Sequence, residues 1–487
     1  MLLTIVTVYL AVSILIGLLA ARRVHTASDY ITAGRNLPMP VVMAMVFATW
    51  FGSETVLGIS ATFLEEGFRG LISDPLGASL CLVLFGLVFA LPLYRMKLMT
   101  LGDFFRRRYD RRIELIVSIC IVVSYLGWVS AQVTALGLVF NVLSDDVVSM
   151  NTGMIIGAGV VLAYTLLGGM WSVAVTTFVQ MIVIVIGLLI VTAIAGDMAG
   201  GIPAVIAKAS AEGKFAFLPE LDLVDILGWT AALVTMALGS IPQQDVFQRV
   251  NSSRNETVAV WATTLGGVSY FFFAAIPLFL AFAAGMIDPE MTQKLMATDS
   301  QLVLPTLVVT HMPFWVQVVF FGALLSVIMS TASGTLLAPS VTFAENVLRG
   351  FVPHMSDRQL LLNTRITVFV FTLMVTVYAV LTEASIHTMV ENAYRITLAG
   401  AFVPLAAGLF WRRASNLGAV LSVFFGLATW LLLELSVDEE TLIVEPQLVG
   451  LIFSLVGMIV GSILQPNPHA DRPHGMVEHH GSTHRAA

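Results

Sequence analysis

The chain is poor in charged residues and in cysteine. Charged residues make up 11% of the 487 positions, whereas a soluble globular chain carries about 25%. Both cysteines, Cys81 and Cys120, lie inside apolar runs, so neither a disulfide framework nor a thiolate metal site is expected. The apolar runs also contain no His/Cys/Asp cluster with ligand spacing and no nucleophile arrangement, which argues against a membrane enzyme.

Long apolar runs are what the sequence does contain. Hydrophobic residues make up 57% of the chain and the mean hydropathy is +0.90. Runs of about 20 residues, long enough to cross a hydrocarbon core ~30 Å thick, recur along nearly the whole length. We therefore predict an all-α integral membrane protein with about 13 transmembrane helices, near residues 2–20, 38–61, 75–95, 113–143, 150–167, 172–196, 223–242, 257–286, 311–345, 364–382, 386–410, 415–435 and 446–465.

The basic residues predict the orientation of these helices. The run at 2–20 has no basic segment before it, and Arg22 and Arg23 follow it, so we interpret it as a retained helix and not as a cleaved signal. Most of the 24 basic residues fall in alternate connections, beginning with that one. Because Lys and Arg favour the cytoplasmic side, we expect a multi-pass protein of the cell membrane with its N-terminus outside and its C-terminus in the cytoplasm. The polar tail at 466–487, rich in Pro, Gly and His, is predicted to be disordered.

Two of the predicted helices are interrupted. The segment 44–54 places Gly, Ser, Thr and a carboxylate near mid-membrane, and the segment 239–245 places Gly and Pro beside a polar cluster. The second begins five helices after the first and on the other side of the membrane. Such a pair predicts an inverted five-helix repeat with the binding site at the breaks. The alternative is that Gly and Pro only kink two packed helices.

This repeat gives the expected division of the chain. The transport core is 38–410, and the breaks lie inside it. An extra helix and a cytoplasmic loop precede it at 1–37, and two additional helices follow at 411–465. Function is therefore expected among the helices of the core, within the lipid bilayer.

A pair of hydroxyls lies near the middle of the span 311–345. Ser330 and Thr331 are adjacent there. Hydroxyls in mid-bilayer usually bond back to carbonyls of their own helix. They also suit a Na⁺ site, because a hard cation prefers oxygen ligands and the break at residues 48–51 frees backbone carbonyls. Residue type alone leaves both readings open.

Three motifs carry a resemblance to a known family. Residues 28–38 (SDYITAGRNLP), 100–109 (TLGDFFRRRY) and 164–173 (YTLLGGMWSV) with Gln180 resemble motifs of the sodium:solute symporter family, in order and over roughly residues 1–465. The resemblance implies an inverted-repeat fold like that of amino-acid transporters and Na⁺-coupled uptake by alternating access. Na⁺ would be the coupling ion, with no organic cofactor.

The same resemblance implies a cation site. Carried over residue by residue, its ligands would be the carbonyls of Ala48, Phe51 and Val327 and the hydroxyls of Ser330 and Thr331. One position departs from the family pattern. Many members have Asp in a "TDxxQ" motif tied to a second cation, whereas this chain has Thr177, which supplies no charge. We therefore expect one Na⁺ per transport cycle.

Within the family, the chain looks most like the choline-transporter branch. Residues 47–50 (FATW) and the segments 239–242 (GSIP) and 247–250 (FQRV) carry that likeness, and Trp128 falls where the branch has an aromatic. Aromatic faces hold quaternary ammonium groups. The cage is incomplete, however, because Ala78 and Gln243 stand at two positions where that branch has aromatics.

Intramembrane polar residues complete the predicted solute site. They are costly and commonly functional, although Asp74 and Asp245 are as readily helix caps or partners of Arg249 or Arg395. We expect a small nitrogen-bearing solute, either an amino acid or a compound related to choline or betaine. The candidate solute-binding residues are Trp50, Glu54, Asp74, Trp128, Gln243 and Asp245.

Several other functions stay open or are disfavoured. H⁺ coupling and sugar or carboxylate substrates are the alternatives within transport. A transporter-like sensor is disfavoured, because no kinase-like domain follows residue 465. A channel has no need of two breaks in an inverted repeat. The sequence predicts neither nucleic acid nor an obligate protein as a partner.

Overall fold

A computed structural model describes residues 1–352, 355–382, 384, 386–436 and 443–466 of the chain. In these residues every regular element is helical, apart from one isolated β-bridge between Leu37 and Ser253. The prediction of an all-α protein is confirmed. The tail for which we predicted disorder lies, from residue 467 onwards, outside the described residues.

The first half of the chain forms two long helices and several short ones. The long ones are α8 (Arg111–Leu143) and α9 (Met150–Met198). The others are α1 (Leu2–Ala21), α2 (Ala27–Thr32), α3 (Met39–Trp50), α4 (Ile59–Glu66), α5 (Ala78–Leu84), α6 (Ala90–Arg95), α7 (Leu101–Arg108), α10 (Ile202–Ala211) and α11 (Leu223–Gly239). Short π-helical turns connect some of them, among them η2 (Glu54–Gly58) and η4 (Ile72–Gly77).

The second half repeats this mixture of long and short helices. The longest is α17 (Phe314–Thr342), which the π-helical turn η7 (Phe343–Leu348) extends. The others are α12 (Gln244–Asn251), α13 (Glu256–Phe273), α14 (Ala275–Ile287), α15 (Pro289–Met296), α16 (Val303–His311), α18 (Arg349–Phe351), α19 (Asp357–Leu381), α20 (Ile386–Thr397), α21 (Val403–Phe410), α22 (Asn416–Ser436) and α23 (Pro446–Leu464).

The helices are apolar enough for a membrane. Among the described residues, ten are long and apolar enough to cross one, or eleven if the pair α11 and α12, bent by 44°, counts as one span. The outer helices expose large apolar side chains such as Leu15, Ile366 and Phe424. A soluble protein would bury such faces, whereas lipid accommodates them.

The exact number of spans stays a prediction. Helix α9 has 49 residues and would be roughly 74 Å long at 1.5 Å per residue, more than twice the hydrocarbon thickness. Gly169 has non-helical angles within it (φ 48°, ψ −136°) and divides it close to the boundary predicted between the spans 150–167 and 172–196. The predicted break between 38–61 and 75–95 likewise falls inside one continuous helical stretch, Glu54–Arg95.

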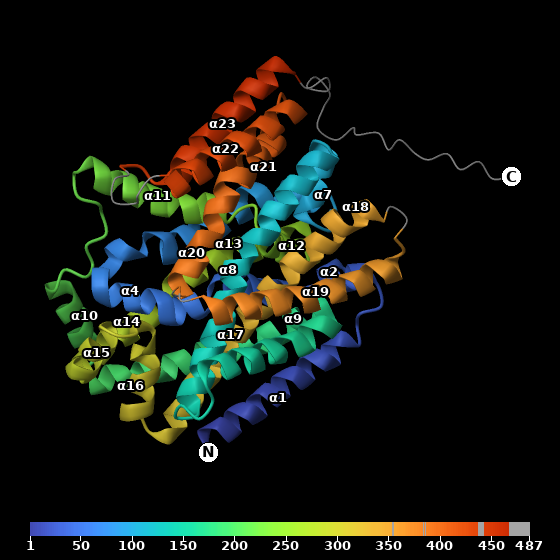
Figure 1. Cartoon of the computed structure of the whole chain (residues 1–487). Helices are drawn as coiled ribbons and strands as arrows, with labels where there is room; N and C mark the ends of the chain where they lie inside the picture. Colours follow the sequence, from blue (N-terminus) through green and yellow to red (C-terminus); the bar gives the residue numbers. More distant parts are fainter. Residues whose placement is uncertain (353–354, 383, 385, 437–442, 467–487) are drawn as a thin grey trace.

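Helix α17 lies at the centre of the bundle. Its most apolar stretch is 67% buried, whereas that of α1 is 22% buried. Helix α17 packs against α3, α8, α9, α12 and α19. Figure 1 shows α1 at one edge of the molecule and the pair α22 and α23 at the opposite edge. This arrangement agrees with a core flanked by added helices, although the predicted boundaries of that core stay a prediction.

Candidate functional site

The first break is made by the backbone between α3 and η2. Phe51 has φ −76° and ψ 73°, which ends α3. The amide of Gly52 therefore donates to the Trp50 carbonyl (2.8 Å), and the Ala48 carbonyl loses the helical partner it would otherwise have. The next amide, that of Ser53, donates to Oε1 of Gln132 on α8 (3.1 Å). A side chain from another helix thus stabilises the break, which frees carbonyl oxygens in the protein interior.

Helix α17 brings its hydroxyls to these carbonyls. The Thr331 hydroxyl donates to the carbonyl oxygens of Ala48 (3.0 Å) and Phe51 (3.3 Å). The Ser330 hydroxyl donates to the Val327 carbonyl on its own helix (2.9 Å). All five residues are fully buried.

These residues fit a small monovalent cation. Their oxygens are neutral, as expected for a weakly held ion, and they are carbonyl and hydroxyl oxygens of the kind that hard cations prefer. The structure therefore brings Thr331 to Ala48 and Phe51, with Ser330 and Val327 in the adjacent turn of α17. Their role as ligands stays a prediction.

An aromatic stack lies beside the break. Trp50 and Trp128 are stacked, with ring centroids 4.9 Å apart and an interplanar angle of 14°. Trp128 also stacks on Tyr125 at 5.7 Å. Tyr394 on α20 meets Trp50 and Trp128 edge-on, at 5.4 and 5.6 Å. The sequence analysis chose both tryptophans and missed both tyrosines, whose only signal was that each lies in an apolar span.

The Glu54 carboxylate turns back over the break. Its Oε2 accepts a hydrogen bond from Nε2 of Gln132 (2.7 Å), and its Oε1 accepts one from the Trp128 indole (3.3 Å). A Cβ at Gly52 would overlap this carboxylate, so a larger residue there would displace Glu54 from its present position. Gln132 therefore holds both the break and Glu54. The sequence analysis missed Gln132, although a glutamine inside the apolar span 113–143 could have indicated a functional residue.

Asp74 lies on η4, in the helical stretch after the first break. The Tyr270 hydroxyl from α13 donates to its Oδ1. The same hydroxyl lies 3.0 Å from that of Thr55, which in turn donates to the Trp50 carbonyl (2.7 Å). Asp74 is thus linked through Tyr270 to the residues around the break. Tyr270 is a further residue that the sequence analysis missed.

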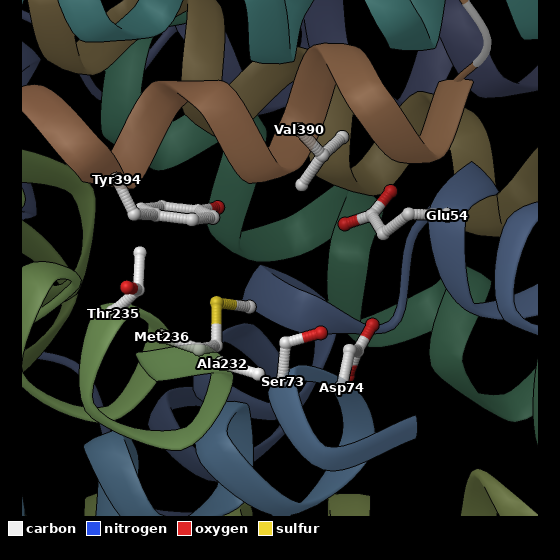
Figure 2. A pocket seen from close by; sticks show the side chains of 8 residues that line it. All are labelled: Glu54, Ser73, Asp74, Ala232, Thr235, Met236, Val390 and Tyr394. Carbon is white, nitrogen blue, oxygen red and sulfur yellow. The ribbon is translucent and has the colours of Figure 1, made fainter. Parts of the chain in front are cut away.

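Glu54 and Asp74 face a common cavity. Figure 2 shows Glu54 and Tyr394 on one side of it and Ser73, Asp74 and Met236 on the other. The cavity holds about 20 Å³, which is room for about one water molecule. An organic solute therefore needs the surrounding side chains to move apart. Its complete lining is Glu54, Ser73, Asp74, Ala232, Thr235, Met236, Val390 and Tyr394.

A larger, polar vestibule of about 490 Å³ adjoins this cavity. Ser73 and Ala232 line both spaces, so the vestibule leads toward the cavity. Glu65, Glu66 and Arg69 stand in its wall. The vestibule therefore lies next to the buried carboxylates, separated from them by the residues that line both spaces.

The second break lies between α11 and α12, and the side chains of Gln243 and Asp245 there are bonded to other protein groups. Asp245 forms a fully buried ion pair with Arg249 (2.6 Å) and accepts a hydrogen bond from the Tyr125 hydroxyl (2.5 Å). The Gln243 amide donates to the hydroxyls of Ser124 (3.2 Å) and Thr397 (3.4 Å). Neither Gln243 nor Asp245 lines the cavity, and their assignment to the solute stays a prediction.

Comparison with known proteins identifies the family. Residues 30–426 match the profile of the sodium:solute symporter family. The chain belongs to that family. It is therefore a membrane transporter of a small solute and not an enzyme, and the family couples transport to Na⁺.

Similar proteins carry different solutes. The chain is 28% identical to human high affinity choline transporter 1 over 91% of this chain and 78% of that protein. It is 26% identical to a sodium/proline symporter of Haemophilus influenzae, over 96% and 95% of the two chains. A solved Na⁺-coupled sialic acid symporter in a substrate-bound outward-open state has the same fold, with a TM-score of 0.79 at 18% identity over 95% and 98% of the two chains.

This symporter differs from the family pattern at Thr177, and that position is buried. In the described part of the chain, its hydroxyl has no hydrogen-bond partner, and neither polar atom of the Gln180 amide has one. Thr177 thus provides a neutral oxygen where many members have a carboxylate.

Proposed function

We propose that this symporter carries a small nitrogen-bearing organic solute into the cell together with Na⁺, by alternating access. The solute is an amino acid or a choline- or betaine-like compound. The observation that carries the proposal is the contact of Thr331 with the Ala48 and Phe51 carbonyls. It joins the central helix α17 to the first break, directly before Glu54.

We assign the residues at and beside this contact as the ligands of the coupling ion. Ala48, Phe51, Val327, Ser330 and Thr331 would hold Na⁺, which when bound supplies a positive charge linking α3 to α17. The hydroxyl protons of Ser330 and Thr331 now point at the carbonyl oxygens. They have to turn away for all five oxygens to face one cation, so these residues change partners as the site fills.

Two features bear on access to the cavity. The vestibule shares Ser73 and Ala232 with the lining of the cavity. At the far end of α17, the Asn346 amide donates to Glu114 (2.9 Å) and Asp103 (3.2 Å), and Arg111 pairs with Glu114 (2.6 Å). These bonds join η7 to α7 and α8. Alternating access requires that they break when the solute leaves towards the cytoplasm, the side on which we place this end in the cell membrane.

We expect one Na⁺ per cycle, because Thr177 carries no charge for a second cation. Purified protein in liposomes tests both coupling and stoichiometry. An inward Na⁺ gradient should drive solute uptake and an equal K⁺ gradient should not. A measured ratio of two Na⁺ per solute would contradict the single site.

A further inference from the structure

Glu54 and Asp74 are two buried carboxylates that face one cavity. Their exposed fractions are 1% and 5%. Within the described residues, no Lys, Arg or His forms an ion pair with either of them, and none lines the cavity. Arg249, which is also buried, is already paired with Asp245. A buried charge is costly unless a counter-charge neutralises it.

Both carboxylates are arranged as hydrogen-bond acceptors. Glu54 accepts one donor on each oxygen, from Trp128 and Gln132, and Asp74 accepts one from Tyr270. An ionised carboxyl group only accepts, whereas a protonated one also donates. The Trp128 indole and the Gln132 amide nitrogen can only donate to Glu54, and the Tyr270 hydroxyl is placed as a donor to Asp74. These contacts suit ionised carboxylates, and a cation in the cavity would offset the cost of burying two negative charges in its lining.

The aromatic residues nearby do not form an open cage. A quaternary ammonium group needs several free ring faces within about 6 Å. Here Trp128 stacks on Trp50 and on Tyr125, so these rings face one another and not the cavity. Tyr394 is the one aromatic side chain in the described lining, and it stands with Ser73 and Thr235, whose hydroxyls are polar.

From this geometry we propose that the solute is a small monocation with N–H donors, a protonated primary or secondary amine, and that Glu54 and Asp74 bind its ammonium group. The inference rests on the proposed function and narrows it. A zwitterion would bring its own carboxylate close to Glu54 and Asp74, and no cationic side chain in the described lining would neutralise it. A trimethylammonium group has no N–H donor for the carboxylate oxygens, and a site built on such bonds rejects an analogue that lacks them.

A matched series of compounds tests this inference on the full chain in liposomes. Ethanolamine (a primary amine), N-methylethanolamine (a secondary amine) and choline differ only in methyl groups on nitrogen, and glycine betaine and alanine are zwitterions. With an inward Na⁺ gradient, we expect ethanolamine to be taken up, choline to bind at least about tenfold more weakly, and the zwitterions not to compete. A site that prefers choline or a zwitterion, with uptake that still depends on Na⁺, overturns the inference and leaves the proposed function standing. Amine uptake that is equal in NaCl and KCl would instead contradict Na⁺ coupling, and therefore the proposed function.

Two variants connect the result to the cavity. Glu54→Gln and Asp74→Asn should each weaken ethanolamine binding more than about tenfold, because a charge-assisted bond is lost. Glu256→Gln is the matched control, since Glu256 pairs with exposed Arg95 away from the cavity. Melting of each variant without solute checks folding. Unchanged ethanolamine affinity in both folded variants would contradict the assignment.

Discussion

The two helix breaks use their polar groups in opposite ways. At the first, the carbonyls of Ala48 and Phe51 accept from the Thr331 hydroxyl, which can turn away to admit an ion. At the second, Asp245 is paired with Arg249, and Thr397 donates to the Gly239 carbonyl (2.6 Å). The first break thus offers ligands, whereas the second holds the bundle together. Two breaks in matching positions of a repeat therefore need not have the same function.

Beside each break, a glycine leaves room for a buried ionic side chain. Gly52 leaves room for the Glu54 carboxylate, and Gly334 on α17 leaves room for the Arg249 guanidinium, which a Cβ at either position would overlap. Glu54 thereby faces a cavity and Arg249 faces Asp245. The comparison predicts functional losses from changes at the first break and stability losses from changes at the second.

The largest effect is expected from Arg249→Met. It leaves Asp245 buried and unpaired, which costs about 3–5 kcal/mol of stability. Thermal melting in detergent measures the loss. Replacing Asp245 with Asn in the same chain should recover much of it, because no unpaired charge is then buried. If the single variant melts like the wild type, the ion pair does not hold the second break.

The next effect belongs to the cation site. Ser330→Ala combined with Thr331→Ala removes two of the five proposed ligands, and the Na⁺ concentration for half-maximal uptake should rise about 30- to 100-fold. Ser340→Ala is the control, since its buried hydroxyl donates to Leu336 on the same helix, away from the break. Unchanged Na⁺ activation in the double variant would remove the assignment.

A smaller effect is expected from Trp50→Ala. The change removes the ring that supports Trp128 and Tyr394 behind the cavity, and solute affinity should fall about tenfold. Trp315→Ala provides the comparison, because that side chain is 54% exposed on the surface. Equal affinity in the wild type and Trp50→Ala would place the stack outside the solute site.

The smallest effect is expected from Thr397→Val at the second break. The variant keeps the shape of the side chain and loses its hydrogen bond to Gly239, at a cost of about 1 kcal/mol. Melting should show this loss, while half-maximal Na⁺ activation stays at the wild-type concentration. A shift in Na⁺ activation here would mean that the two breaks do not differ as we describe.

Much of this arrangement was predictable from local sequence. Gly52 and Ser53 inside an apolar run indicated the first break, and adjacent hydroxyls at Ser330 and Thr331 indicated oxygen ligands. The helical structure and its likeness to a solved Na⁺-coupled sialic acid symporter confirmed the fold. Asp245 could have been a solute ligand or a partner of Arg249, and the sequence left both open, although the spacing of four residues permitted the pair.

What the sequence did not reveal is which helices meet. Gln132, Tyr270 and Tyr394 contact the site from α8, α13 and α20, each far along the chain from the break. A lone polar or aromatic residue in an apolar span gives no sign of the helix it faces. That Glu54 and Asp74 have no ion-pair partner among the described residues could not be predicted either, because the sequence does not show that Arg249 pairs with Asp245.

The most direct test of Na⁺-coupled binding is thermal melting of the purified protein with and without solute, in NaCl and in KCl. A ligand that binds only the folded state stabilises it by about 2.7 kcal/mol at a hundred times its dissociation constant. Because coupling between two sites is reciprocal, the solute should raise the melting temperature in NaCl and much less in KCl. Equal shifts in the two salts would contradict the account.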